Sequence, residues 1–311
     1  MELKNENLEN KNEDEQAKVN IRIILRIGFA AGLLCCIGWF IYYLISLRSS
    51  DEQVDALKDK YVSKMPSETL VEEAPVESEE AEPEPVNLFG GVEYDTTENY
   101  EVPELTLDFK GMQEECEDLY AWIYIPDTKI DYPVLQKEDD AEYYLQRDMH
   151  GNRSASGSIF TQYYNSTDWT DPNTVIYGHN MKNGSMFATL HYFEDSVFFE
   201  EHPYVYIFTP EYTLVYQIFG AYEFSNIHLM MSYDFKDHDS FQMYLDRVFE
   251  RNGMKDHFNR ELEVTADDRI ITLSTCVSGQ ATNRYMVQAK LVAVEQKESN
   301  EGTEAARAQT E

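Results

Sequence analysis

The chain has 311 residues, and its 25 lysines and arginines against 58 aspartates and glutamates give a formal net charge of −33. This acidity argues against a nucleic-acid binder and against a protein held on anionic lipid by a basic patch, because both depend on clustered cations. Hydrophobic residues at 42% and aromatic residues at 13% exclude a wholly disordered chain, and four cysteines are too few for a disulfide scaffold.

The first structural feature in chain order is an uncharged apolar run, IGFAAGLLCCIGWFIYYLISL, at residues 27–47. As a helix it spans a hydrocarbon core of about 30 Å. A cleaved signal peptide is the alternative, but the run is longer than a usual signal core and no small-residue cleavage site follows it. We therefore predict a cytoplasmic tail at 1–26, a single transmembrane anchor at 27–47 and the rest of the chain on the extracellular face of the plasma membrane. The basic residues before the run favour this orientation slightly.

The segment that follows has a different composition. Between residues 51 and 104 there are 17 acidic residues against three lysines, a net charge of −14. Such a segment buries too little apolar surface to fold, and its charges repel and extend it. We predict an acidic disordered stalk at 48–104, a folded head at 105–296 and a disordered tail at 297–311.

The head opens with a helical pattern. Phe109, Met112, Cys116 and Leu119 recur at helical spacing, which predicts a helix over these residues and places the Cys116 thiol on its buried, apolar face. Eight β-branched or aromatic runs follow, separated by turn-forming residues, as in a closed or nearly closed β structure. In chain order these runs are AWIYI, DYPVL, GSIFT, NTVIYGH, YVYIFT, TLVYQIFGAYEF, RIITLSTC and YMVQAKLVAVEQ.

A second helix is expected between the sixth and seventh of these runs. An apolar stripe extends from Phe241 to Phe249 with helical spacing. Asp239 and Gln242 resemble a capping box at its start, and Gly253 can end it.

Cys276 ends the strand-like run IITLSTC. In a strand, Ile271 and Leu273 point one way while Ser274 and Cys276 point the other, so the thiol shares a polar face. A seven-residue loop, VSGQATN, leads to the next strand pattern, which predicts a hairpin with Arg284 almost opposite Cys276. A guanidinium beside a sulfur can stabilise a thiolate, or the oxyanion that forms when the thiolate attacks a carbonyl.

A thiol nucleophile also needs a residue that moves protons, and histidine is the usual one. Most of the seven histidines lie among polar residues and are interpreted as solvated surface residues. His179 differs, because it follows the strand-like TVIY and Gly178, where side chains can enter a cleft. The pattern therefore favours a site of Cys276, His179 and Arg284. A free cysteine at a strand end with an unrelated surface histidine remains the alternative.

Three segments together resemble the catalytic segments of sortases, membrane-anchored cysteine transpeptidases of Gram-positive bacteria. They are NTVIYGHNM (173–181), TLSTC (272–276) and NRYMVQAKLV with its Arg284. AWIYIPDTKIDYPVLQ (121–136), YYL (143–145), GSIF (157–160) and the helix before the cysteine strand resemble class B of this family. The resemblance covers essentially the whole head. It implies a mainly β fold, a sortase-type closed β-barrel with an N-terminal helix and a helix inserted before the Cys-bearing strand.

The resemblance also implies a reaction and its residues. Cys276 attacks the threonine carbonyl of a C-terminal sorting signal of the NPxTx or LPxTG kind, His179 moves protons, and Arg284 holds the carbonyl and oxyanion. The resulting thioester passes the protein to a peptidoglycan precursor or cross-bridge amine. The positions that match the substrate groove are Tyr177, Ser274, Thr275 and Leu145.

Two departures from class B border that groove and put the exact sorting motif in doubt. Ala141 stands where class B enzymes often carry an asparagine, and the seven-residue loop after Cys276 is short. A pilin-polymerising sortase, which uses a pilin lysine as the amine, is an alternative that the sequence does not separate. A stalked, non-enzymatic binding domain is a third. The sequence shows no metal-ligand spacing and no Gly-rich phosphate loop, so we expect no metal and no cofactor.

Overall fold

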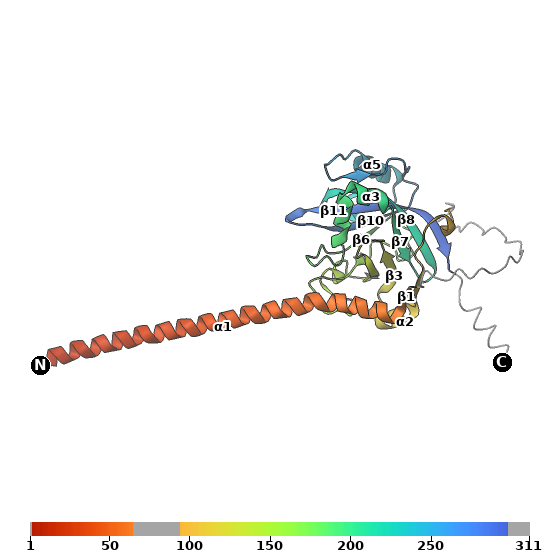
Figure 1. The fold of residues 1–311 in the computed structure, drawn as a ribbon. Helices are drawn as coiled ribbons and strands as arrows, with labels where there is room; N and C mark the ends of the chain where they lie inside the picture. The colour runs from red at the N-terminus through yellow and green to blue at the C-terminus, as the bar shows by residue number, and fades with distance from the viewer. Residues whose placement is uncertain (1, 65–93, 298–311) are drawn as a thin grey trace, which may run out of the picture. The chain divides into compact units, whose positions relative to one another are not determined.

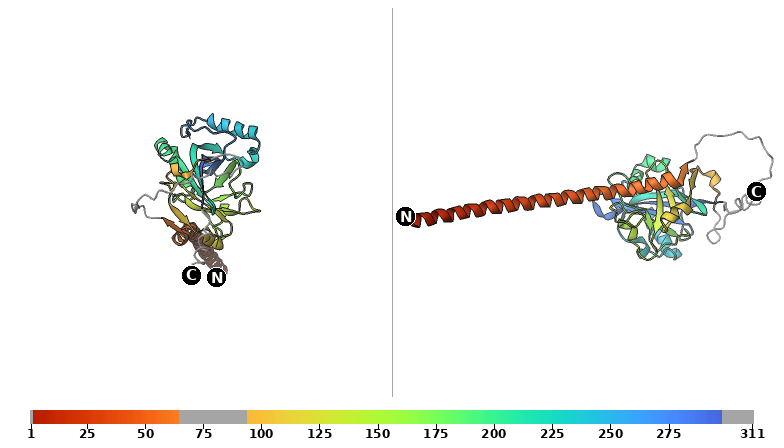
Figure 2. Two further views of the ribbon diagram at one scale, coloured as in Figure 1. Left: turned by 90° about the vertical axis from the view of Figure 1, so that its right-hand side faces the viewer. Right: turned by 90° about the horizontal axis from the view of Figure 1, so that it is seen from below.

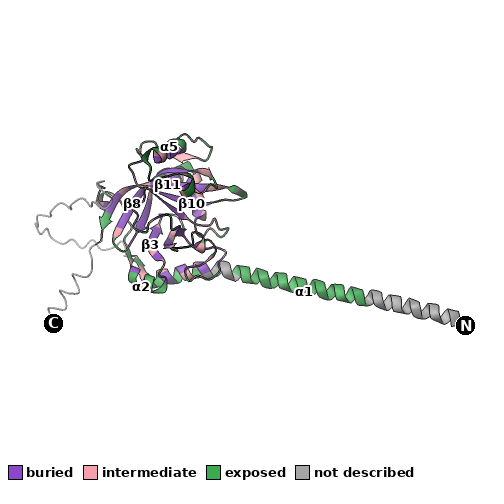
Figure 3. Cartoon of the chain, turned by 180° about the vertical axis from the view of Figure 1, so that it is seen from behind, coloured by how far each residue is buried: buried purple, intermediate pink, exposed green. Residues whose placement is uncertain are grey.

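The computed structural model describes residues 2–64 and 94–297. The chain divides into two units, residues 1–48 and residues 49–311. Helix α1 (Glu2–Tyr61) begins in the first unit. Its stretch Asn20–Leu44 is long and apolar enough to cross a membrane, with a mean hydropathy of 2.1 and exposed side chains (Figure 3). Most of the predicted disordered segments, 65–93 and 298–311, lie outside the described residues, so the predicted domain boundaries stay predictions there.

In the second unit, eight strands close into a barrel. Their order is β11-β10-β6-β5-β4-β3-β7-β8, and β8 pairs with β11 to complete the circle (Figure 1). The barrel strands are β3 (Leu119–Tyr124), β4 (Asp131–Gln136), β5 (Phe160–Thr161), β6 (Asn173–Tyr177), β7 (Tyr204–Phe208), β8 (Tyr212–Ser225), β10 (Ile270–Val277) and β11 (Gln280–Gln296). Outside the barrel, β9 (His257–Phe258) pairs with β8, and β1 (Val62–Lys64) pairs with β2 (Leu105–Leu107). The predicted mainly β, closed-barrel fold is confirmed.

Side chains that alternate along each strand point into the barrel and fill it. In β10, Ile271 and Leu273 join the apolar core inside it, while Thr272 on the opposite face bonds to other buried polar side chains. Burying one such aliphatic side chain stabilises the fold by about 1.5–3 kcal/mol. Two bulges in the long pairing of β8 with β11 let these strands bend around the core.

Short helices connect and cover the strands. They are α2 (Phe109–Glu115), α3 (Ser196–Glu201), α4 (Leu229–Ser232), α5 (His238–Phe249) and the 3-10 helices η1 (Thr97–Asn99), η2 (Tyr143–Gln146) and η3 (Ala188–Glu194). The end of α1 and α2 lie on one side of the barrel and α5 on the opposite side (Figures 1 and 2). Leu57, Phe109 and Met112 are buried in the first of these layers. Phe241 and Leu245 are buried on the face of α5 that packs against the barrel.

The first predicted helix is shorter than its pattern suggested. α2 ends at Glu115, the Cys116 N–H caps it by donating to the Met112 carbonyl at 2.9 Å, and Leu119 already begins β3. The side chains of Met112, Cys116 and Leu119 are nevertheless buried in one core, because the extended backbone at Cys116 turns the chain back towards that core. The prediction of a buried Cys116 is confirmed.

The second predicted helix has a different cap. The side chain of Asp237, not Asp239, accepts the N–H of Ser240 at 2.8 Å, which is the usual reach of an N-cap carboxylate. α5 ends at Phe249, so Gly253 lies beyond the helix and does not cap it.

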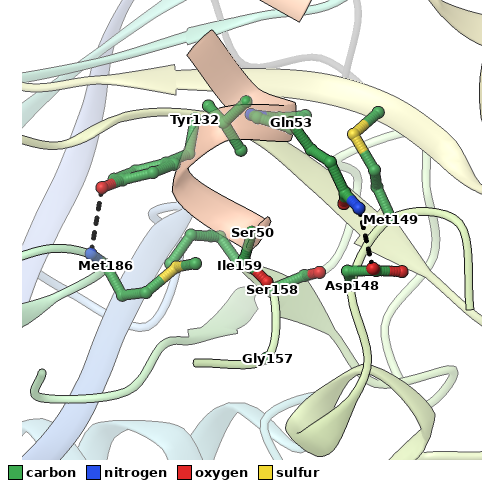
Figure 4. Close-up of a pocket in the computed structure, with 11 residues that line it drawn as sticks. Ser50, Gln53, Tyr132, Asp148, Met149, Gly157, Ser158, Ile159 and Met186 are labelled. Carbon is green, nitrogen blue, oxygen red and sulfur yellow. Dashed lines mark hydrogen bonds between the residues drawn. The ribbon is translucent and has the colours of Figure 1, made fainter. Parts of the chain in front are cut away.

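The prediction of a disordered stalk over 48–104 does not hold at either end of that range. Residues 49–61 are the C-terminal part of α1, and residues 94–104 include η1. Val54 and Leu57, three residues apart on one helix face, are only 8% and 2% exposed. Gln53 Nε2 donates to Asp148 Oδ2 at 2.9 Å, and the helix turn at Ser50 covers a small pocket in the head (Figure 4). Residues 49–61 are therefore packed against the head through both apolar and polar side chains.

The docking of α1 generates a prediction. Leu57→Ala should lower the free energy of unfolding of the head by about 2–4 kcal/mol, because it removes a fully buried aliphatic side chain and leaves a cavity. Asp59→Ala, on the exposed side of the same helix, should change it by less than about 0.5 kcal/mol. Urea unfolding followed by near-UV circular dichroism measures both. Equal stabilities for the two variants would show that residues 49–61 do not support the head.

Candidate active site

Strands β6 and β10 run parallel and in register, with Tyr177 beside Ser274. Beyond this pair the two chains stay together, because Gly178 N–H donates to the Ser274 carbonyl at 3.2 Å. The Thr275 hydroxyl donates to the Gly178 carbonyl at 2.8 Å. His179 and Cys276, each two residues past the Tyr177–Ser274 pair, therefore emerge at the same edge of the barrel wall.

The predicted hairpin after Cys276 is present. β10 and β11 are antiparallel, and Cys276 is the register partner of Arg284, so both side chains lie on one face of the sheet. The connection is tighter than the predicted seven-residue loop. The strands continue to Val277 and Gln280, the turn between them uses Gly279 at φ +77°, and a bulge takes up the remaining residues.

The ring of His179 is fixed by the main chain of η2. Its Nε2 lies 2.7 Å from the carbonyl oxygen of Leu145. A carbonyl only accepts hydrogen bonds, so Nε2 carries a proton and Nδ1 is the nitrogen available for proton exchange. Leu145, which the sequence predicted as a groove residue, thus positions His179 through its backbone carbonyl.

Two glycines make this approach possible. A Cβ on Gly178 would lie within 2.7 Å of side-chain atoms of both Ile159 and Phe187. A Cβ on Gly157 would lie 2.6 Å from the Leu145 carbonyl oxygen, the same oxygen that holds His179, and the φ of Gly157 is +58°. Neither position accommodates a larger residue without displacing the segment that carries His179.

Arg284 and Tyr177 lie on the two strands that flank the end of β10. Burial raises the pKa of the Tyr177 phenol, and the positive charge of Arg284 works in the opposite direction. The Tyr177 ring also stacks on Phe160 with their centroids 5.6 Å apart. Arg284 Nη1 donates to its neighbouring Asn283 carbonyl at 3.1 Å, which holds the guanidinium at the strand end.

All seven residues that the sequence singled out line one pocket of about 230 Å³. They are Leu145, Tyr177, His179, Ser274, Thr275, Cys276 and Arg284. Thr275 lines the pocket but is almost fully buried, and its hydroxyl donates to the Gly178 carbonyl. Its side chain therefore links the ends of β10 and β6. The sequence pattern did not indicate residues 226–229, which follow β8, include His228 and also line the pocket. The apolar Ile227 and Leu229 just after a strand were the available signal.

The two cysteines of the head lie in opposite environments. Cys276 is exposed, whereas Cys116 is buried and its Sγ lies 3.2 Å from the Met149 carbonyl oxygen. Burial raises the pKa of the Cys116 thiol to about 11. Among residues 2–64 and 94–297, no cluster of three histidine, cysteine or acidic side chains has the geometry to hold a metal ion. The pocket brings together an exposed thiol, an imidazole and a guanidinium, the groups of a thiol nucleophile with a proton carrier and an oxyanion donor.

The sequence pattern did not single out His191 among the histidines, most of which it placed on the solvated surface. Its side chain is only 20% exposed, and its Nε2 lies 3.1 Å from the carbonyl oxygen of Cys276. A histidine three residues before Glu194 on a helical segment was the signal for a built contact.

The head is similar in sequence and in structure to proteins of one known family. A sortase-domain family profile matches residues 123–292. The chain is 36% identical over 190 residues to sortase B of Listeria monocytogenes, covering 60% of this chain and 74% of the relative. It is 30% identical over 188 residues to sortase B of Staphylococcus aureus, covering 60% of this chain and 75% of that relative. The crystal structure of sortase B from Bacillus anthracis in complex with AAEK2 superposes with a TM-score of 0.53 at 33% identity, covering 60% of this chain and 84% of that one.

The contrast between the thiols predicts a labelling order. Of the two cysteines of the folded head, a methanethiosulfonate reagent at pH 7.5 should modify Cys276 before Cys116, because Cys116 is buried and its raised pKa keeps it protonated at that pH. Peptide mapping by mass spectrometry after short exposure measures the order, with Cys276→Ala as the control that loses the fast adduct. Faster modification of Cys116 would contradict the assignment of the reactive thiol.

Proposed function

The chain belongs to the sortase family, is a class B member and is a cysteine transpeptidase, and on this premise we propose that Cys276, His179 and Arg284 carry out its reaction. The substrate is a secreted protein with a C-terminal sorting signal of the NPxTx or LPxTG kind. The bond cleaved follows the threonine, and the acceptor is a peptidoglycan amine.

In the first half-reaction the Cys276 thiolate attacks the threonine carbonyl carbon and forms a tetrahedral oxyanion. The planar guanidinium of Arg284, opposite Cys276 on β11, donates to that oxygen. The carbon–nitrogen bond then breaks, and the leaving amine takes the proton from Nδ1 of protonated His179. The products are a thioester at Cys276 and the released C-terminal peptide.

In the second half-reaction an incoming amine attacks the thioester. His179, now neutral at Nδ1, accepts a proton from that amine, and Cys276 leaves as the thiolate. One amide is exchanged for another in two acyl transfers, so no ATP is needed.

One observation carries this proposal above the others. Cys276 and Arg284 are register partners on adjacent strands, and β6 delivers His179 to the same edge and the same pocket. The hydrogen bond from His179 Nε2 to the Leu145 carbonyl supports Nδ1 as the nitrogen that moves protons. Tyr177 and Ser274, on the pocket wall beside these residues, are proposed to contact the sorting signal.

The location follows from the same premise. We assign the apolar stretch Asn20–Leu44 as a single-pass anchor, with the N-terminus inside and the head on the extracellular face, where sorting signals and wall amines meet. A pilin lysine in place of the wall amine is the remaining alternative for the acceptor. Because the chain belongs to a family of enzymes, the alternative of a non-enzymatic binding domain is dropped.

The reaction predicts transfer rather than hydrolysis alone. A peptide carrying a sorting signal, incubated with the protein and an oligoglycine, diaminopimelate-like or lysine amine, should give the amine-linked peptide detected by mass spectrometry. Cys276→Ala should give neither product. If every amine leaves only the hydrolysed acid, the protein acts as a protease under these conditions and the proposed transfer is wrong.

The oxyanion role predicts a specific sensitivity at Arg284. Arg284→Lys should lower kcat for peptide cleavage by about 10²–10³, because a flexible ammonium does not reproduce the planar donors of the guanidinium. His179→Ala should lose at least as much activity, while the thermal midpoints of both variants stay close to that of the wild type. Cleavage by Arg284→Lys within about twofold of wild type would show that positive charge alone is sufficient.

A further inference from the structure

His191, on η3, contacts the segments that bear all three proposed catalytic residues. Its Nε2 lies 2.9 Å from Nδ2 of Asn180, which follows His179 in the chain. The same nitrogen is 3.1 Å from the Cys276 carbonyl oxygen. The ring also stacks on Tyr285, the residue after Arg284, with centroids 4.9 Å apart and planes inclined by 27°.

A charged pair orients the His191 ring. Glu194 Oε1 lies 2.6 Å from His191 Nδ1, and the Lys255 ammonium binds the other carboxylate oxygen. Burial acts to raise the pKa of Glu194, but the hydrogen bonds and charges of Lys255 and His191 outweigh it and lower the pKa. The carboxylate therefore stays ionised, and Nδ1 of His191 is its hydrogen-bond donor.

With this tautomer the side-chain amide of Asn180 bridges His191 and the Cys276 carbonyl. When the ring is neutral, His191 Nε2 accepts one hydrogen of Asn180 Nδ2, and the second hydrogen of that amide goes to the Cys276 carbonyl oxygen at 2.8 Å. When the ring is protonated, Nε2–H points at the same carbonyl directly. In both states the main chain at Cys276 is held from the side of His191.

The contacts from His191 and Asn180 reach the Cys276 backbone at the point where regular pairing of β10 with β11 ends. The register of β10 with β11 shifts between Cys276 and Val277, so the regular ladder ends at the nucleophile. His191 and Asn180 contact the Cys276 backbone carbonyl and are not among the residues that line the pocket.

We propose that His191 is a positioning residue: through Asn180 and the Cys276 carbonyl, it sets the direction of the thiol relative to His179 and Arg284. The inference rests on the proposed catalytic roles of those three residues. A misplacement of about 1 Å in a reacting group can lower a rate on the order of 10²-fold, which is why a backbone support matters here.

The test separates the ring nitrogens of His191 from its packing. His191→Phe keeps a ring to stack on Tyr285 and removes both nitrogens, whereas His191→Gln keeps a polar atom near the position of Nε2. His202→Phe is the matched control, because His202 also stacks on an aromatic ring, Phe198 at 3.9 Å, and also contacts a carboxylate and a carbonyl. The full chain in detergent micelles is used throughout, with kcat, KM and thermal midpoint measured for each variant.

We expect His191→Phe to lower kcat about 10–100-fold with KM within about threefold of wild type, since the pocket wall is unchanged. His191→Gln should keep kcat within about fivefold, and His202→Phe within about twofold. If His191→Phe does not fold, Glu194→Gln replaces it, with an expected loss of about 3–10-fold in kcat. A kcat of His191→Phe within threefold of wild type overturns the proposal. So does an inactive His191→Gln, because it would make the imidazole itself a proton carrier.

A substrate-free measurement keeps this test independent of the proposed function. The rate of Cys276 alkylation by iodoacetamide, followed by mass spectrometry of the Cys276 peptide, should fall at least threefold in His191→Phe because the thiolate moves away from Arg284. It should not change in His202→Phe. If wild type cleaves no sorting peptide, the proposed function fails while this readout still decides the role of His191. Equal alkylation rates in both variants overturn the positioning role.

Discussion

The parallel pairing of β6 with β10 brings together residues that lie about a hundred positions apart in the chain. Tyr177 and Ser274 are register partners, and the residues after them remain hydrogen-bonded. His179 and Cys276, which follow at the ends of the two strands, therefore lie at one edge of the sheet. The antiparallel pairing of β10 with β11 then adds Arg284 opposite Cys276. A connecting segment adds to this arrangement, because the Leu145 carbonyl of η2 holds the His179 ring. The three residues lie on, or two residues past the end of, three adjacent barrel strands, so the site depends on the pairing of those strands.

The pocket lies on the outer face of the barrel wall, and that face is protected by polar contacts. Gln288 Nε2, fully buried beneath α5, donates to the hydroxyls of Tyr244 and Thr272, while its Oε1 accepts from the Tyr222 hydroxyl at 2.6 Å. Buried polar groups that find partners cost little, and they fix α5 in one register on the sheet. The polar face of β10 that marked Cys276 in the sequence is thus buried along most of its length and opens only at its end.

How much of this was predictable depends on the range of the interaction. The eight strands and the Cys276–Arg284 hairpin follow from local alternation and short spacing, and all seven proposed site residues do line one pocket. The docking of α1 through Leu57 was missed because the acidic composition around it dominates any local average. The contact of His191 with Cys276 was missed because it depends on how η3 folds back over two other segments. Backbone groups such as the Leu145 carbonyl leave no mark in side-chain patterns at all.

We propose that Cys276 carries the acyl group between the two halves of one amide exchange. To detect this acyl group, the protein is mixed with a sorting-signal peptide in the absence of amine and quenched with acid, and the intact mass and the modified residue are measured. We expect a transient mass increase equal to the peptide up to and including its threonine, as a thioester on Cys276, which disappears when an amine is added. Cleaved peptide with no acyl adduct at any time, or an adduct on Cys116, would contradict it.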